Sequence, residues 1–199
     1  MNRRRCPLGL ATLGIVLTVI PGLHGCAGLL IGGAATGITV AHDRRTTGTV
    51  IDDQTIELKL QDALNRQLPP GNHLSVTSYN GAVLLTGQIV SAPARQLAED
   101  IARQIDPPVR EVYNELVIGP PMALSAQAND ALLTTKVKTS LFQINNLPDF
   151  DPSRVKVVTE NGVVYLLGLV RPVEADAAAE IASQVAGVRQ VVTIFEYID

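Results

Sequence analysis

The sequence predicts an α+β protein of two tandem αββαβ units, each a three-stranded sheet covered by two helices. Three features predict this fold. A stretch around residue 80 recurs around residue 161, an Asn-Gly pair lies between two apolar, β-branched runs in each copy, and residues with helical apolar spacing precede and follow each pair. A chain of 199 residues is long enough for two such small domains.

The N-terminus has the pattern of a secretory signal peptide. Residues 3–5 are arginines, residues 8–20 are mainly apolar, and Pro21-Gly22 ends the run. About 13 apolar residues are too few for the roughly 20 that a spanning helix needs, so a transmembrane anchor is the weaker interpretation. We therefore predict that residues 1–25 are a signal peptide.

The residues that follow predict a lipid anchor. Leu23-His24-Gly25-Cys26 resembles a bacterial lipobox, in which the Cys is lipidated and becomes the mature N-terminus. Residue 27 is Ala rather than Asp, which by analogy with lipoproteins favours the outer membrane over the inner one. The alternative is an ordinary signal peptide that leaves Cys26 as a free thiol. Lipidation of Cys26 would leave the mature chain without a thiol, since Cys6 lies in the signal peptide.

Residues 26–51 are predicted to be a tether after lipidated Cys26. The part from 28 to 41 is apolar and rich in Gly, and it is too short to span a bilayer. A flexible stalk is the favoured interpretation, because each glycine costs a helix roughly 1 kcal/mol relative to Ala. The alternative is that this part lies on the membrane surface.

The internal repeat fixes the rest of the organisation. Residues 75–87 align without a gap with residues 156–168, at an offset of 81. Asn80-Gly81 falls on Asn161-Gly162, and Gly87 falls on Gly168. We predict a first domain over 52–118, a linker over 119–128 that Pro120-Pro121 stiffens, and a second domain over 129–199.

The elements of the first unit follow in order. Ile56, Leu60 and Leu64 recur at helical spacing, and Asp52 or Asp53 is placed to cap that helix. Strands over 74–79 and 82–90 flank Asn80-Gly81, whose residues suit the positive φ angles of a type I′ hairpin turn. A second helix is expected over 94–105, with Leu97 in its apolar stripe, and a third strand over 110–118.

The second unit repeats this order. Helices are expected near 130–143 and 174–185, and strands near 155–159, 163–170 and 189–198. Gly87 and Gly168 lie inside the second strand of each unit, where a glycine indicates a bulge or a close backbone approach. We interpret each as a point over which a helix packs tightly, with a ligand contact as the alternative. Gly81 and Gly162 are expected to serve the turns.

These residues together resemble the BON domain family. The resemblance rests on the αββαβ order, the Asn-Gly before the second strand, the Gly inside it, and Val109-Arg110 with Val188-Arg189 downstream. A signal peptide, a lipobox and two such units resemble dual-BON outer-membrane lipoproteins. That resemblance implies binding of phospholipid, especially anionic lipid, at the periplasmic face of the outer membrane. It also implies a role in envelope integrity and stress response rather than in catalysis.

Charge placement favours the second unit as the lipid-binding one. Loss of residues 1–25 removes three of the 16 basic residues, which leaves 13 against 19 acidic and a net charge of −6. Anionic lipid therefore requires a local basic patch. The segment 131–144 contains Lys136 and Lys138 and no acid, and Leu132 and Phe142 fall outside its core stripe. These four residues are the candidate lipid site. The alternative is that Leu132 and Phe142 pack against the other unit or the linker.

Other functions have little support in the residues. The net charge argues against nucleic-acid binding, and the chain shows no phosphate loop, Cys cluster or His pair that would predict a metal, a cofactor, a small-molecule substrate or catalysis. Asp149 and Asp151 around Phe150 suggest a cation site or, more simply, a turn. The main rival is a protein-binding adaptor for envelope assembly or maintenance factors, using a free strand edge. Peptidoglycan binding is a third, weaker option.

Overall fold

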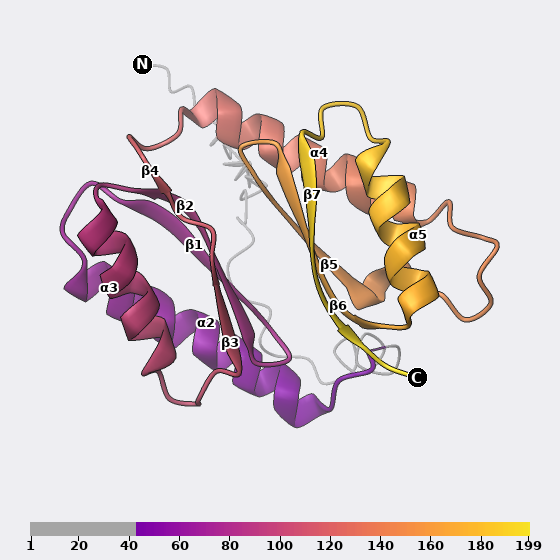
Figure 1. Cartoon of the computed structure of the whole chain (residues 1–199), viewed down its shortest axis with the longest axis horizontal. Coiled ribbons are helices and arrows are strands. Elements are labelled where there is room, and N and C mark those ends of the chain that lie inside the picture. Colours follow the sequence, from indigo (N-terminus) through magenta and orange to yellow (C-terminus); the bar gives the residue numbers. More distant parts are fainter. Residues whose placement is uncertain (1–42) are drawn as a thin grey trace, which may run out of the picture. The chain divides into compact units, whose positions relative to one another are not determined.

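The computed structural model describes residues 43–199. The signal peptide 1–25, the lipidation site Cys26 and all but the end of the tether 26–51 lie outside the described residues. Within the described part, two αββαβ domains follow one another along the chain (Figure 1). The predicted fold class is therefore confirmed.

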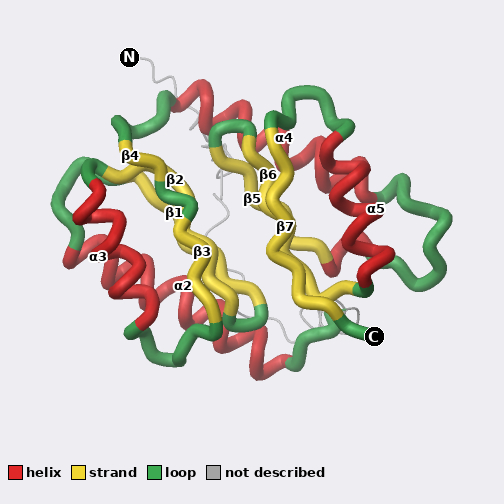
Figure 2. Tube along the Cα trace, viewed as in Figure 1, coloured by secondary structure: helices red, strands yellow, loops and turns green. Residues whose placement is uncertain are grey.

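The first domain is a mixed sheet with two helices on one face (Figures 1 and 2). Strands β1 and β2 pair antiparallel, while β3 and β4 both pair parallel with β2. The predicted third strand is thus split into two short strands, because Leu116 between them turns into the core, where it is 2% exposed. The elements are α2 (Thr47–Gln67), β1 (His73–Tyr79), β2 (Ala82–Ile89), α3 (Ala92–Arg103), β3 (Glu111–Asn114) and β4 (Val117–Ile118).

The second domain repeats the arrangement with a longer last strand. Strands β5 and β6 pair antiparallel, and β6 and β7 pair parallel over eight residue pairs. The elements are α4 (Leu124–Leu141), a 3-10 turn η1 (Pro152–Arg154), β5 (Val155–Glu160), β6 (Val163–Val170), α5 (Pro172–Ser183) and β7 (Gln190–Tyr197).

Two helix starts differ from the prediction. Helix α2 begins at Thr47, and the hydroxyl of Thr46 caps it by accepting from the Thr49 backbone N–H at 3.1 Å. The prediction that Asp52 or Asp53 caps this helix is therefore wrong. Helix α4 begins at Leu124, inside the expected linker, because the residues after Pro121 (Met-Ala-Leu-Ser-Ala-Gln-Ala) favour helix.

On α3, Leu97 is 39% exposed, so it lies at the margin of the apolar stripe.

The Asn-Gly turns have the predicted geometry in both domains. Asn80 and Gly81 have φ angles of 51° and 75°, and Asn161 and Gly162 have φ angles of 49° and 74°. These paired positive values belong to a type I′ turn, which suits the twist of a two-residue hairpin. Gly81 and Gly162 therefore serve the turns, as expected.

The strand glycines make room for a neighbouring strand rather than for a helix. A Cβ on Gly87 would lie 2.2 Å from the backbone oxygen of His73, at the start of β1. A Cβ on Gly168 would lie 2.8 Å from the backbone oxygen of Arg154, just before β5. The close approach was predicted, but its interpretation as helix packing was wrong, because the crowding comes from the antiparallel partner strand.

Apolar side chains cover both faces of each sheet. One face carries the helices, and the residues buried there include Leu60 and Leu85 in the first domain and Val137 and Leu166 in the second. A third cluster lies on the opposite faces and combines residues of both domains: Tyr79, Leu84, Tyr165, Leu167 and Ile194. Strands β2 and β6 are therefore buried on two sides, which explains their nearly continuous apolar sequences.

Candidate functional site

The outward face of α4 carries the four predicted lipid-binding residues. Leu133, Val137 and Leu141 point into the core and are at most 2% exposed. Leu132, Lys136, Lys138 and the C-cap residue Phe142 face solvent. Leu132 is 53% exposed and Phe142 is 72% exposed, so neither packs against the other domain or the linker. The structure shows the exposure that a lipid site needs; lipid contact itself remains a prediction.

The four residues form two pairs on that face. Leu132 and Lys136 are four positions apart, as are Lys138 and Phe142, so each apolar side chain has a lysine one turn away. Because successive residues turn by about 100°, the pairs lie on opposite flanks of the exposed face. Between them lie Thr135 and Thr139, whose hydroxyls donate to backbone oxygens one turn earlier. The face therefore has an uncharged middle and two flanks, each with one apolar and one basic side chain.

The two lysines on the exposed face of α4 have no acidic partners among the described residues, unlike two basic residues of the equivalent helix in the first domain. Within the part of the chain that the structure describes, neither Lys136 nor Lys138 forms an ion pair. On α2, the equivalent helix of the first domain, Arg66 pairs with Asp62 and Lys59 lies 3.7 Å from a carboxylate oxygen of Asp106. The α4 face therefore presents uncompensated positive charge on a protein that is acidic overall.

A groove of about 370 Å³ begins beside Lys138 and Phe142. Arg45, Tyr79 and Lys156 also line it. The Arg45 guanidinium lies 3.9 Å from the centre of the Tyr79 ring, a cation–π contact. Arg45 and Lys156 form ion pairs, so Lys138 is the one cation lining this groove without an ion pair among the described residues.

Arg45 and Lys156 are held by carboxylates. Arg45 donates to Asp53 at 2.8 Å and to Asp43 at 2.7 Å, and Lys156 Nζ lies 2.7 Å from a carboxylate oxygen of Glu57. Burial alone would raise the pKa of the Asp43 carboxyl, but the hydrogen bonds from Arg45 outweigh it and the pKa lies below its usual value. The ion pair between Asp43 and Arg45 consequently persists at neutral pH.

Two buried aspartates, which the sequence reasoning missed, hold the hairpin turns. Asp53 accepts from the backbone N–H groups of Asn80 and Gly81 at 2.7 and 2.9 Å. Asp130 does the same for Asn161 and Gly162 at 2.6 and 2.9 Å. A signal for this was available, because Asp53 and Asp130 are 77 positions apart, the same offset that aligns Ile56 with Leu133.

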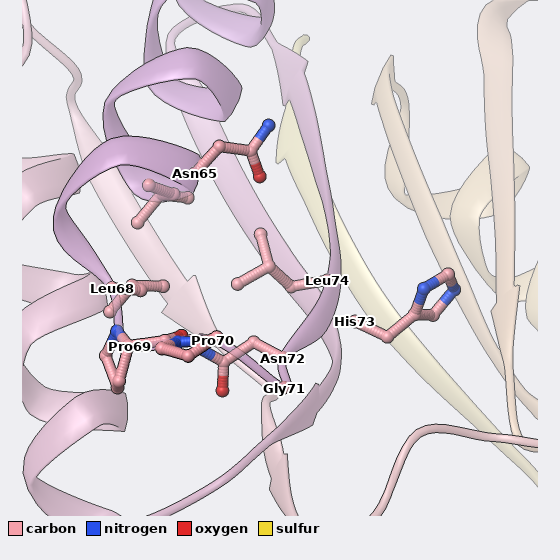
Figure 3. Close-up of a pocket in the computed structure, with 9 residues that line it drawn as sticks. Asn65, Leu68, Pro69, Pro70, Gly71, Asn72, His73 and Leu74 are labelled. Carbon is pink, nitrogen blue, oxygen red and sulfur yellow. The ribbon is translucent and has the colours of Figure 1, made fainter.

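A hollow of about 430 Å³ beside the loop from Leu68 to Leu74 is lined by residues that are not suited to catalysis (Figure 3). Its lining is mainly Leu, Pro and Asn. The imidazole of His73 points away from Leu68 and Pro69 (Figure 3), and no acid or nucleophile lines the hollow with it. This pocket gives no support to an active site.

Asp149 and Asp151 belong to a turn. Asp151 caps η1 by accepting from the backbone N–H of Ser153 at 2.9 Å, and Asp149 has a positive φ of 67°. Among residues 43–199, no group of His, Cys, Asp or Glu is arranged to hold a metal ion. In the same range, no helix combines the length and the apolar character needed to cross a bilayer.

Comparison with known proteins identifies the family. The model of the BON domain matches twice, over residues 52–120 and 129–198. The chain belongs to the BON domain family. It is 41% identical over 192 residues to the outer membrane lipoprotein DolP of Haemophilus influenzae, an alignment that covers 96% of this chain and 97% of that protein. The predicted dual-BON, DolP-like organisation and the outer-membrane location are therefore confirmed, and the chain is an outer-membrane lipoprotein with two BON domains.

The chain is also similar to two further proteins. The 21 kDa hemolysin of Actinobacillus pleuropneumoniae is 35% identical over 78% of this chain and 79% of its own length. The osmotically-inducible protein Y of Escherichia coli is 29% identical over 79% of this chain and 78% of its own length. Among solved structures, CdsD, a structural protein of the type III secretion system of Chlamydia trachomatis, aligns with 71% of this chain and 91% of that chain at 12% identity and a TM-score of 0.30. That last similarity is too low to support an argument.

Proposed function

We propose that this BON lipoprotein is non-catalytic, binds anionic phospholipid at the periplasmic face of the outer membrane, and thereby supports envelope integrity. The observation that carries the proposal is the exposed face of α4. There Lys136 and Lys138 stand without acidic partners next to the exposed side chains of Leu132 and Phe142. Basic residues flanking exposed apolar ones are typical of an interfacial helix. The resemblance to dual-BON lipoproteins supports the same conclusion.

The second domain is the better candidate of the two. Its α4 contains no acid from residue 131 onward, whereas α2 carries Glu57 and Asp62 at comparable positions. Lysines contribute roughly 1 kcal/mol each near an anionic surface, so the α4 face binds weakly by itself. Attachment of the chain to the same membrane through Cys26 would compensate, because tethering raises the effective concentration of the face at the lipid surface.

A single tryptophan tests this proposal, since the chain contains none. In Phe142→Trp, the new indole would report whether the α4 face enters the lipid. The full-length lipoprotein is reconstituted into vesicles of zwitterionic lipid with brominated chains, with and without anionic phospholipid. We expect quenching that appears with anionic lipid and falls as salt is raised.

Two comparisons make the test specific. Adding Lys136→Glu and Lys138→Glu should abolish the quenching, whereas Lys59→Glu with Arg66→Glu on α2 changes the net charge equally and should leave it intact. Val173→Trp, at an exposed site on α5, should remain unquenched. If the indole at position 142 stays unquenched on anionic vesicles, or if both charge reversals act alike, the α4 face is not the lipid site.

A protein-binding adaptor is the second candidate function. One observation favours it: β4 leaves Val117 and Ile118 more than half exposed at the edge of the first sheet.

A further inference from the structure

A second groove, of about 320 Å³, lies where the chain leaves the first domain. Apolar side chains line much of it, including Val117 and Ile118 of β4, Met122 of the following connection and Tyr165 of β6. Val117 is 54% exposed and Ile118 is 53% exposed. An apolar surface of this kind, left open to solvent between two domains, is typical of an interaction site.

Strand β4 offers an unoccupied edge along this groove. It pairs parallel with β2, through Gln88 with Val117 and Ile89 with Ile118. Within residues 43–199, no strand pairs with its other side. Edge strands expose backbone N–H and C=O groups that a further extended segment can satisfy. The groove therefore combines a backbone template with apolar contacts for alternate side chains of a bound strand.

The polar part of the groove is acidic. Glu115 and Glu160 both line it, and neither forms an ion pair with any residue that the structure describes. Glu160 accepts a hydrogen bond from Gln88 Nε2 at 2.6 Å. Burial, together with the nearby Asp130 carboxylate, raises the pKa of Glu160 even though this hydrogen bond lowers it. His73 lies near enough to lower this pKa, but it forms no ion pair with Glu160, so a cationic side chain of a ligand could supply one.

We propose that this groove binds an extended segment of a partner protein that carries Lys or Arg between apolar residues and adds as a strand beside β4. Apolar side chains of the segment contact Val117, Ile118 and Met122, and its basic side chain pairs with Glu115 or Glu160. The site is separate from the α4 face, so it stands or falls independently of lipid binding.

The acidic side chains of the groove favour a basic segment over a second copy of the chain or anionic lipid. A second copy of the chain docked edge to edge would bring the Glu115 and Glu160 carboxylates of both copies together, which is repulsive. Anionic phospholipid would be repelled for the same reason. The groove thus differs in sign from the α4 face, whose free side chains are lysines.

Peptide binding to the full-length lipoprotein in nonionic detergent tests the proposal. The probe is a fluorescein-labelled peptide, Thr-Val-Lys-Val-Arg-Val-Thr, followed by fluorescence anisotropy. We expect saturable binding, and about a ten-fold or greater weakening in Glu115→Gln with Glu160→Gln. The control variant, Asp176→Asn with Glu180→Gln, removes two carboxylates from α5 outside the groove and should bind like the wild type. Both double variants keep the shape of the side chains, so loss of folding is avoided.

Two altered peptides decide the mode of binding. A peptide with Glu in place of Lys and Arg should fail to bind, and one with alternate backbone amides N-methylated should also fail, because it cannot complete a β ladder. The proposal is overturned if no peptide binds, if the acidic peptide binds as well as the basic one, or if N-methylation has no effect. Concentration-dependent dimers that Ile118→Lys dissociates would instead assign the groove to a second copy of the chain.

Discussion

The aspartates beneath the Asn-Gly turns show how one buried carboxylate organises a hairpin. Asp53 is 3% exposed, and it accepts from the Ser78 hydroxyl as well as from the two turn N–H groups and Arg45. Asp130 is 6% exposed and accepts from the turn N–H groups alone. In each hairpin, the backbone N–H groups of the two turn residues have no acceptor on the neighbouring strand. The buried carboxylate accepts from both of them and so satisfies these donors.

Replacing these aspartates should destabilise the two domains unequally. Asp130→Ala leaves two backbone donors unpaired, at a cost of about 2–3 kcal/mol in the free energy of unfolding. Asp53→Ala also removes the acceptor of the Ser78 hydroxyl and one of the two carboxylates that pair with Arg45, so we expect about 3–5 kcal/mol. Urea denaturation of each variant measures this, with the exposed neighbour Asp52→Ala as the control.

The prediction is tested by the order of the three variants in their loss of unfolding free energy. Asp52→Ala should change stability by less than about 0.5 kcal/mol. An Asp52 variant as damaged as the Asp53 variant would mean that loss of helical charge, and not loss of the turn contacts, explains the effect.

At the scale of residues, the sequence predicts the two Asn-Gly turns but not the buried aspartates that accept hydrogen bonds from them. The Asn-Gly pairs are local signals, because the residues that need positive φ are themselves the turn. The sequence predicts a helix cap at Asp53, since a cap is also a local pattern. Its partners in the hairpin lie 25 or more positions away along the chain, and only the packed fold brings them together.

At the scale of elements, the strand order and the helix faces could be predicted and the crowding between strands could not. Periodicity located α3, α5 and all the long strands within a few residues, because the buried faces set the apolar pattern. The glycines of β2 and β6 signalled a close approach correctly. Which element approaches depends on the register of the hairpin, where Leu74 lies opposite Gly87 and Val155 lies opposite Gly168.

Alanine substitution at the glycines should separate conformational strain from crowding. Gly87 has a φ of 114° and almost no room for a Cβ, so Gly87→Ala should cost about 3 kcal/mol or more. Gly168 is crowded without a positive φ, and Gly168→Ala should cost about 1–3 kcal/mol. Gly119→Ala meets nothing within 4 Å and should be nearly neutral. Thermal unfolding of the three variants measures the order of their losses in stability. If Gly87→Ala proved no worse than Gly119→Ala, the tight hairpin register described above would be incorrect.

At the scale of the whole described chain, two consecutive arginines join segments that lie far apart in sequence. Arg45 is fixed to the first domain through Asp53 and Tyr79. Arg44 donates both guanidinium nitrogens to Glu174, at 2.6 and 2.8 Å, and also to the backbone oxygen of Leu169. The end of the tether is therefore fastened to both domains at once.

This fastening could not be predicted from the sequence. Asp43-Arg44-Arg45 reads as a polar end to an apolar tether, and Glu174 lies 130 positions away from Arg44. Glu174 was placed correctly at the start of a helix, where it completes a capping box by accepting from the Arg171 backbone N–H at 2.7 Å. That local role gives no indication of a second, bidentate partner from the other end of the described chain.

The Arg44–Glu174 pair should make stability depend on pH. Hydrogen bonding from Arg44, followed by that from the Arg171 backbone, lowers the pKa of Glu174 despite its burial. A carboxyl whose pKa is lower in the folded than in the unfolded chain adds stability above the unfolded value, and this is lost as pH falls through the folded value. The side chain of Glu174 is 2% exposed, so breaking the pair at neutral pH leaves a buried charge and should cost about 3–5 kcal/mol.

A double-mutant cycle isolates this pair from the other acidic groups. Arg44→Ala, Glu174→Gln and the double variant are unfolded in urea at several pH values between about 7 and 3. We expect a coupling energy of a few kcal/mol at pH 7 that shrinks below about pH 5 as the Glu174 carboxyl takes up a proton. A coupling energy that stayed constant down to pH 3 would mean that neutral hydrogen bonds, rather than the ion pair, fasten the tether. A value near zero at pH 7 would mean that Arg45 alone holds it.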